Sequence, residues 1–376
     1  MTITTRAAIL RNSGAARPYA DSRPLVIETV TLDPPGPGEV LVAIKAAGLC
    51  HSDLSVINGD RPRPLPMALG HEAAGVVEAL GEGVTDLAVG DHVVMVFMPS
   101  CGHCDPCAGG RPALCEPGAV ANGAGELLGG GRRVHAGAEV VNHHLGCSAF
   151  AERAVVSRRS LVRIDATLSF EEAALFGCAV LTGVGAVVNT AGVKAGQSVV
   201  VIGLGGVGLA SVLGALACGA SPVVAVDLSE QKLALARTLG PVQTVNAADP
   251  DAVARVRALT GGGADVALEM AGSVRALESA WAMTRRGGLT VTAGLPPADA
   301  ALAVNVVSLV AEERTLKGSY IGTCVPSRDI PRYVALYRDG RLPVDRLMSG
   351  TIALDDINAG FDRLQAGEVV RLVVTP

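Results

Sequence analysis

The feature that most constrains the fold is a glycine-rich turn between a short apolar strand and a helix-length segment. Residues 199–202 read Val-Val-Val-Ile, and the next residues include Gly203, Gly205 and Gly208 in the spacing G-x-G-x-x-G, with Gly206 and Val207 in the same turn. A tight turn, close approach of backbone to a pyrophosphate and close helix packing each need a residue without Cβ. The helix N-terminus adds N–H donors. The segment predicts a dinucleotide-binding βαβ unit; the alternative is a glycine-rich structural turn.

An acidic residue at the end of the next apolar stretch supports the dinucleotide interpretation. Asp227 follows Gly208 by nineteen residues, where an acid accepts hydrogen bonds from a ribose 2′-hydroxyl. A carboxylate there repels a 2′-phosphate, and neither Leu228 nor Ser229 supplies a cation to hold one, so the sequence favours NAD over NADP. Lys232 is a candidate contact for the adenosine end of the cofactor, or else a solvated helix charge.

The pattern of apolar residues changes near residue 179, and this change indicates two domains. Residues 1–178 contain short apolar runs separated by Gly and Pro, which is typical of a mostly-β domain. Residues 179–321 alternate apolar strands with helix-length segments, which predicts a doubly wound parallel sheet. The mixed segment 322–376 lacks a core pattern of its own and is expected to complete the first domain. The predicted fold class is therefore α/β.

Composition excludes several classes of function. The protein has 376 residues, a net charge of −5 and 18% charged residues, so it has no basic stripe for nucleic acid. No apolar run is long enough to span a membrane, and no secretory signal pattern is visible. We therefore expect a cytoplasmic protein whose partner is a small molecule.

Four of the nine cysteines lie within fifteen residues. Four thiolates at such spacing wrap one tetrahedral Zn²⁺ and leave no open position, which is the pattern of a structural site. His103 is a possible competing ligand, and the alternatives are a chance grouping of cysteines or two disulfides in a cytoplasmic protein. The predicted ligands are Cys101, Cys104, Cys107 and Cys115.

A second group of metal-ligating residues is spread over the sequence. Cys50, His71 and Cys178 are far apart, and spacing alone cannot bring them together. A catalytic zinc takes three protein ligands and one exchangeable position, and two thiolates with one imidazole form such a set. Any one of these residues taken singly is better explained as a buried structural cysteine or a core histidine than as a metal ligand.

These motifs together resemble the zinc-dependent medium-chain alcohol dehydrogenases, particularly the liver-type and glutathione-dependent formaldehyde dehydrogenase branch. The resemblance extends over nearly the whole sequence. It is carried by the four-cysteine segment, the glycine turn and three further stretches, Gly70-His-Glu-x2-Gly75-x5-Gly81-x2-Val84, Phe176-Gly-Cys178 and Gly367-Glu-Val-Val-Arg371. It implies a GroES-like catalytic domain, a Rossmann-type coenzyme domain, and hydride transfer between NAD and a primary or secondary alcohol.

The resemblance also implies roles for the residues around a catalytic zinc. Cys50, His71 and Cys178 would hold that ion, and the four-cysteine segment would hold a structural one, giving two zinc ions per protomer. Ser52 would pass on the substrate proton, Asp53 would orient the ligand histidine, and Glu72 would lie behind the metal.

The resemblance also implies which residues face the cofactor and the substrate. His51 and Arg371 match positions beside the pyrophosphate. Phe97 and Leu295 match positions that line the substrate pocket, although either could be ordinary core. Ser55 stands where the liver enzymes have a histidine that completes the proton relay, so the outer end of the relay is undetermined.

Two alternative functions stay open, and the protein is expected to form an oligomer. One alternative is a dehydrogenase of thiol adducts such as S-hydroxymethylglutathione, and the other is a zinc-free quinone reductase or a non-catalytic dinucleotide-binding protein. Relatives of this length are often homodimers, with a tetramer as a further possibility. The apolar run at residues 301–310 is a candidate strand at a subunit interface, or else an ordinary buried strand.

Overall fold

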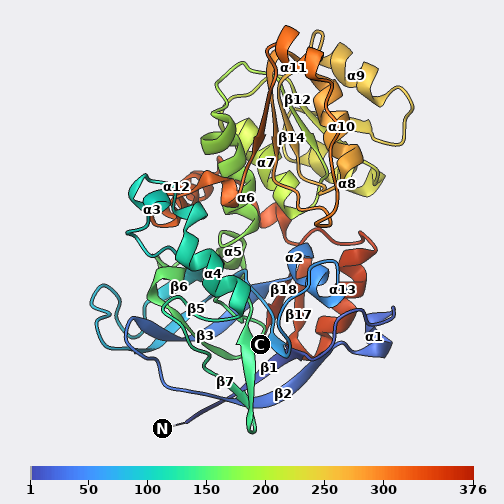
Figure 1. The fold of residues 1–376 in the computed structure, drawn as a ribbon. Coiled ribbons are helices and arrows are strands. Elements are labelled where there is room, and N and C mark those ends of the chain that lie inside the picture. Colours follow the sequence, from blue (N-terminus) through green and yellow to red (C-terminus); the bar gives the residue numbers. More distant parts are fainter. Residues whose placement is uncertain (1) are drawn as a thin grey trace. The chain divides into compact units, whose positions relative to one another are not determined.

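The computed structural model describes residues 2–376 and divides into two compact units (Figure 1). The first comprises residues 2–178, 325–331 and 348–376, and the second comprises residues 179–324 and 332–347. Among the described residues, no helix has the length and apolar character that crossing a bilayer requires.

The first unit contains a closed barrel. Its strands follow the order β1 (Ile3–Leu10), β2 (Leu25–Leu32), β7 (Val134–Ala136), β8 (Glu139–His143) and β4 (Met67–Ala68). Alternate residues point inward, as the period of a strand requires: Ala7 and Ile9 of β1 pack against Val30 and Leu32 of β2 in one buried cluster. Val141 of β8 belongs to the same cluster, and β8 ends directly before residue 144.

A second sheet of the same unit positions the segments that carry the candidate site. Its order is β10 (Leu161–Ile164), β6 (His92–Met95), β5 (Ala73–Leu80), β3 (Glu39–Gly48), β18 (Leu372–Thr375) and β17 (Gly350–Ala353), with β9 (Arg153–Ser157) also paired to β3. The last strand of the protein returns to this sheet, since Val373 pairs with Gly48. The C-terminal residues therefore lie beside those that precede Cys50.

Short helices connect these strands. They are α1 (Tyr19–Ser22), α2 (His51–Ile57), α3 (Asp105–Ala108), α4 (Glu116–Ala124), α5 (Phe170–Leu175) and α13 (Ile357–Gln365), while α12 (Pro326–Arg338) begins in the first unit and ends in the second.

The second unit is built on six parallel strands. Their order is β13 (Val242–Asn246), β12 (Val223–Asp227), β11 (Val199–Ile202), β14 (Ala264–Glu269), β15 (Thr284–Thr292) and β16 (Thr315–Gly318). The helices of this unit are α6 (Ala179–Gly185), α7 (Gly206–Ala217), α8 (Glu230–Thr238), α9 (Ala252–Leu259), α10 (Val274–Met283) and α11 (Val306–Ala311), and a π-helical stretch covers Ala186–Ala191. The strand order reverses next to β11, which is the point where such sheets bind dinucleotides. The predicted α/β class with a doubly wound parallel sheet is confirmed.

The expected strand at residues 301–310 is wrong. The Asn305 side chain accepts a hydrogen bond from Ser308 N at 3.1 Å, and this cap begins α11 instead of a strand. The valines of α11 are not buried either, because Val306, Val307 and Val310 are 67–72% exposed. One edge strand of the sheet is β16, a few residues further on.

Candidate functional site

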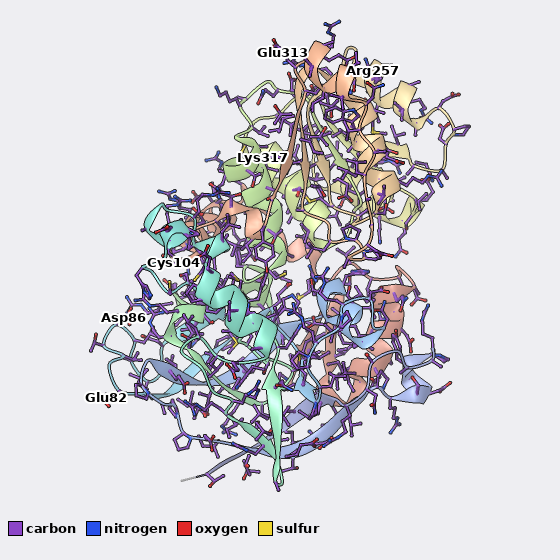
Figure 2. All side chains as sticks on the ribbon, viewed as in Figure 1. Glu82, Asp86, Cys104, Arg257, Glu313 and Lys317 are labelled. Carbon is purple, nitrogen blue, oxygen red and sulfur yellow. The ribbon has the colours of Figure 1, made fainter. Side chains whose placement is uncertain are left out.

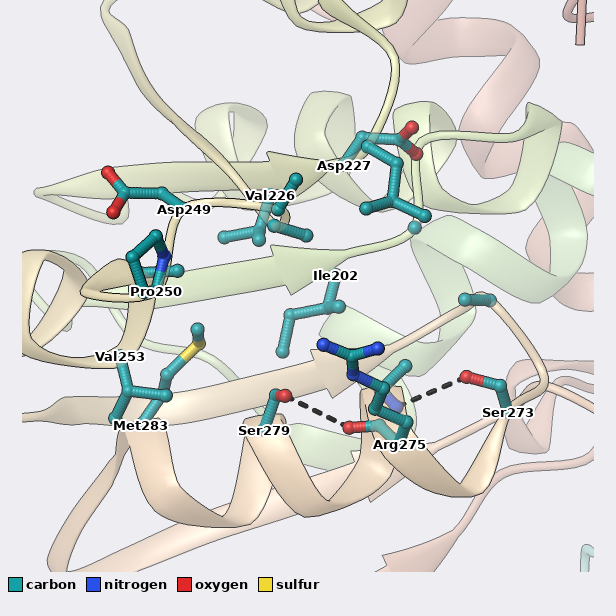
Figure 3. A pocket seen from close by; sticks show the side chains of 17 residues that line it. Ile202, Val226, Asp227, Asp249, Pro250, Val253, Ser273, Arg275, Ser279 and Met283 are labelled. Carbon is teal, nitrogen blue, oxygen red and sulfur yellow. Dashed lines mark hydrogen bonds between the residues drawn. The ribbon is translucent and has the colours of Figure 1, made fainter.

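A cavity of about 370 Å³ opens at the carboxyl ends of the parallel strands (Figure 3). Ile202 ends β11, Asp227 ends β12, and both line it together with Ser273 and Arg275 around the start of α10. The size is that of a site for a small ligand or part of a cofactor. The cavity is thus at the place that the strand order assigns to a dinucleotide.

The three motif glycines of the turn serve different purposes. Gly203 has φ +88°, and a Cβ there would lie 2.6 Å from Ala271 N. A Cβ on Gly208 would collide with Gly203 O, so any side chain would push α7 off the strand. A Cβ on Gly205 would meet no atom within 4 Å, which leaves open space before the uncapped N-terminus of α7. This arrangement fits a pyrophosphate above the turn.

Asp227 is fixed at the mouth of the cavity by two backbone donors. Leu204 N donates to Oδ2 at 2.6 Å and Ser229 N donates to Oδ1 at 2.9 Å. Lys232 lies in the first turn of α8, where its backbone N–H donates to Ser229 Oγ at 3.4 Å, and it is not among the cavity-lining residues. Arg275 lines the cavity without having been singled out by the sequence motifs, because helix α10 carries no signature of its own.

The three scattered metal-ligating residues converge within the first unit. Cys50 immediately precedes α2, His71 lies between β4 and β5, and Cys178 follows α5. All three are buried, and their ligand atoms lie within 4.8 Å of one another. The three residues therefore form one cluster, although their spacing in the sequence did not predict that they lie together.

The separations in this cluster fit tetrahedral zinc. Cys178 Sγ lies 3.5 Å from His71 Nε2. Zinc bonds of about 2.3 Å to sulfur and about 2.05 Å to nitrogen at the tetrahedral angle place those two atoms about 3.6 Å apart. The hydrogen bond from Cys178 lowers the pKa of Cys50 well below its ordinary value against the opposing effect of burial, with Arg371 and His71 adding to it. A cation is the natural partner for such a thiolate.

An acid on α2 orients the histidine of the cluster. Asp53 is fully buried, and its Oδ1 lies 3.0 Å from His71 Nδ1 and accepts a hydrogen bond from Gly70 N at 3.2 Å. The contact leaves Nε2, the other ring nitrogen, directed at the cysteines. Burial opposes a charge on the ring, but Asp53 and Cys50 together raise the pKa of His71 well above its ordinary value.

A second buried acid lies behind the thiolates. Glu72 is fully buried, and neither carboxylate oxygen has a hydrogen-bond partner among the described residues. Arg371 Nε lies 3.6 Å from Glu72 Oε1. Arg371 is itself only 3% exposed, and its guanidinium also donates to Leu49 O at 2.7 Å. Burial raises the pKa of Glu72 to about 7, although the Arg371 charge opposes this. Arg371, expected beside a pyrophosphate, contacts the acid of the metal cluster here.

Three residues of α2 occupy positions that the resemblance connects with the cofactor or the proton relay. His51 is exposed and Ser52 is half-buried in the first turn, next to Cys50. Ser55, one turn later, donates its hydroxyl proton to His51 O at 2.8 Å. That proton is directed at a backbone carbonyl, which cannot pass it on.

The four clustered cysteines form a separate lobe, marked by Cys104 in Figure 2. Cys104 Sγ and Cys115 Sγ lie 3.9 Å apart, close to the roughly 3.8 Å that two Zn–S bonds at the tetrahedral angle require. Backbone N–H groups of Cys101 and Gly118 donate to Cys115 Sγ, which suits a thiolate. His103 is turned to Cys101 O at 3.1 Å and stays outside the cluster, so the four thiols are the complete donor set.

The two expected pocket residues have different surroundings. Phe97 is buried, and its ring meets that of His71 edge to face with centroids 5.3 Å apart. Leu295 belongs to the second unit, follows β15, and is 54% exposed. Only Phe97 is thereby placed at the metal cluster.

Comparisons with known proteins match both halves of the sequence. A family model described as the alcohol dehydrogenase GroES-like domain matches residues 36–166, and one described as zinc-binding dehydrogenase matches residues 206–339. A Mycobacterium tuberculosis protein with the description "Putative alcohol dehydrogenase D" is 40% identical over 374 residues, covering 98% of this protein and 99% of its own length. S-(hydroxymethyl)glutathione dehydrogenase of Paracoccus denitrificans is 36% identical over 380 residues, with the same coverage. The crystal structure of benzyl alcohol dehydrogenase from Acinetobacter calcoaceticus superposes with a TM-score of 0.92 and 33% identity over 99% of both proteins.

Proposed function

The protein belongs to the zinc-dependent medium-chain alcohol dehydrogenases, and from this premise we propose that it transfers a hydride reversibly between a primary or secondary alcohol and NAD. The observation that carries the proposal is the convergence of Cys50, His71 and Cys178 in one buried cluster with tetrahedral spacing. A protein that only bound a dinucleotide, or a zinc-free reductase, would have no use for this donor set.

The metal cluster supplies the chemistry at the substrate oxygen. A zinc ion held by Cys50, His71 and Cys178 would lower the pKa of an alcohol hydroxyl and, in the reverse direction, polarise a carbonyl. Asp53 keeps His71 in the tautomer that offers Nε2. The four-cysteine lobe is proposed to hold a second, purely structural zinc, because four thiolates leave no position for a substrate.

Ser52 is the proposed first carrier of the substrate proton. It follows Cys50 by two residues in the first turn of α2 and is half-buried, so part of the residue is open to solvent. Ser55 does not continue the path, because its own proton is given to a backbone carbonyl. We therefore propose that the side-chain path ends at Ser52, with solvent beyond it.

The second unit is proposed to bind NAD. The glycine turn and the N-terminus of α7 would receive the pyrophosphate through the backbone of Gly205, Gly206 and Val207. Asp227 would accept hydrogen bonds from the ribose hydroxyls, and its charge would repel a 2′-phosphate. Lys232, His51 and Arg371 remain weaker candidates for cofactor contacts, since the observed contacts of Arg371 are within the metal cluster.

One aromatic side chain at the metal cluster indicates the character of the substrate pocket. Phe97 packs edge to face on the ligand histidine, so the substrate side of the cluster is proposed to be apolar. Benzyl alcohol dehydrogenase is among the superposing structures, which favours aromatic or other apolar alcohols. The thiol-adduct alternative is supported by the similarity to S-(hydroxymethyl)glutathione dehydrogenase.

A substrate panel tests the proposal. Reduction of NAD and of NADP is followed by the absorbance of the reduced nicotinamide with primary, secondary and aromatic alcohols, and with S-hydroxymethylglutathione. Turnover of simple alcohols with NAD supports the proposed function. Turnover restricted to the thiol adduct would replace it by the alternative, and turnover only with NADP would overturn the role given to Asp227.

A homodimer is proposed for the assembled enzyme. The strand β16 lies at one edge of the parallel sheet, and the neighbouring helix α11 exposes Val306, Val307 and Val310. An edge strand beside exposed apolar side chains is suited to pairing with a second copy. Light scattering distinguishes a dimer from a monomer or a tetramer, and charging Val307 by Val307→Glu should shift a dimer toward the monomer.

A further inference from the structure

A second buried histidine contacts the acid that orients His71. His144 follows β8 directly and is 1% exposed. Its Nδ1 lies 3.1 Å from Asp53 Oδ1, the same oxygen that His71 approaches, although the N–H direction does not meet the angle of a hydrogen bond. The two imidazole rings stand at 88° to one another with centroids 5.5 Å apart. One carboxylate oxygen therefore lies within contact distance of two histidines.

The contact requires a particular tautomer of His144. A ring nitrogen that turned its lone pair toward a carboxylate would be repelled, so the proton of His144 belongs on Nδ1. Burial lowers the pKa of His144, although the contact with Asp53 opposes this effect. His144 thus offers Asp53 a protonated ring nitrogen and not a lone pair, so the contact with the carboxylate is favourable.

Few other contacts fix the orientation of the Asp53 carboxylate. Its Oδ2 is buried without a hydrogen-bond partner among residues 2–376, so the orientation of the carboxylate depends on the contacts of Oδ1. Of these, Gly70 N and His71 belong to the loop that carries the ligand itself. Only His144 comes from a different segment, which adds an anchor outside that loop.

The turn that carries His144 is held firmly. His144 N donates to Ser148 Oγ at 3.1 Å, and Cys147 N donates to His144 O at 3.0 Å. Leu145 and Ser148 adopt left-handed backbone conformations with φ of +51° and +53°. Such conformations cost roughly 1 kcal/mol or more each and persist where the surroundings determine them. The ring of His144 is consequently presented to Asp53 from a rigid support.

We propose that His144 is a positioning residue that acts through Asp53 to fix the ring of His71 for the catalytic zinc. The inference rests on the proposed function, because it assumes a zinc ion at Cys50, His71 and Cys178. It predicts that removal of the N–H group facing Asp53 weakens binding of that ion and changes its coordination, while the lobe zinc is unaffected. Losses of about 10- to 100-fold in metal affinity are typical when such outer partners of a ligand are removed.

The test compares two substitutions at His144. His144→Asn keeps an N–H group near the place of Nδ1, and His144→Leu removes it. The matched control is His143→Asn, because His143 is the adjacent buried histidine and its ring contacts Arg133 N and Ser148 Oγ instead of Asp53. Zinc affinity is measured by competition with a chromogenic chelator, and cobalt substituted at the same ligands reports their geometry through its visible spectrum.

The expected result is a drop of about 10-fold or more in affinity for the zinc at Cys50, His71 and Cys178 in His144→Leu, with a shifted cobalt spectrum. His144→Asn and His143→Asn should stay within about threefold of the wild type, and the lobe zinc serves as an internal measure of folding. If His144→Leu does not fold, His144→Gln, which moves the N–H group by one bond, should bind zinc more weakly than His144→Asn.

Two results overturn the proposal and are distinguishable from each other. Unchanged affinity and spectrum in His144→Leu, or an equal loss of affinity in His144→Leu and His143→Asn, would remove the positioning role while leaving the proposed function intact. A wild-type protein that holds zinc only in its lobe would refute the proposed function, and the inference with it.

Discussion

Replacement of Asp227 by Asn tests the cofactor assignment with little change of shape. The Asp227 carboxylate accepts hydrogen bonds from Leu204 N at 2.6 Å and Ser229 N at 2.9 Å, and it lies at the mouth of the cavity. In the proposed complex it also accepts from the ribose of NAD. Asn retains one acceptor oxygen but loses the charge.

The magnitude follows from the strength of a hydrogen bond to a charged acceptor. Such a bond contributes about 1.5–3 kcal/mol, which corresponds to a loss of about 10- to 150-fold in kcat/KM for NAD. NADP should lose less or gain, because the charge that repels its 2′-phosphate is removed. The ratio of the two kcat/KM values should therefore fall by about tenfold or more.

A matched control separates cofactor recognition from stability. Asp265 accepts hydrogen bonds from Ser198 N at 2.8 Å, Ser198 Oγ at 2.7 Å and Arg285 Nε at 2.7 Å, at the opposite end of the same parallel strands. Asp265→Asn should lower the melting temperature without changing the NAD to NADP ratio. The reasoning is refuted if Asp227→Asn leaves that ratio unchanged, or if Asp265→Asn shifts it equally.

Three further predictions follow from single contacts. Ser52→Ala should lower kcat by about 10- to 1000-fold with both zinc ions retained, since general acid–base groups contribute factors of that order; unchanged turnover in steady-state assays would remove its role. Gly48→Ala would place a Cβ 2.9 Å from Glu72 Oε1, so we expect a loss of zinc or of turnover without unfolding, and wild-type kinetics would contradict the tight packing. Burial and the charges of Arg133 and Arg132 lower the pKa of His143 from 6.5 to about 3. The unfolded protein therefore binds an extra proton between these two pKa values, and stability should fall on acidification by about 1.4 kcal/mol per pH unit. Urea unfolding at neutral pH and at about two pH units lower should show a smaller loss in His143→Asn, and an equal loss would exclude this source.

Local patterns were sufficient to predict the coenzyme half of the fold. The G-x-G-x-x-G turn dictates a strand, a tight turn and a helix because two of its glycines are forced by close contacts with neighbouring backbone. Apolar strands alternating with helical segments then indicate a parallel sheet, while the order of its strands is known only from the structure.

Other features could not be predicted, because they depend on distant segments. The cluster of Cys50, His71 and Cys178 was suggested only by family resemblance, since three different connections bring it together. The contact between His144 and Asp53 has no local signature at all, because one residue follows a barrel strand and the other lies on α2. The expected strand at residues 301–310 failed because apolar content alone does not distinguish a strand from a capped, exposed helix.

Metal analysis is the most direct test of a catalytic zinc beside a structural one. The account predicts about two zinc ions per protomer in the purified wild-type enzyme, and about one in Cys50→Ser together with loss of alcohol oxidation and retention of the fold. The remaining ion should be lost only on substitution in the four-cysteine lobe, for example in Cys104→Ser. One zinc per wild-type protomer, or full alcohol oxidation by Cys50→Ser, would contradict the account.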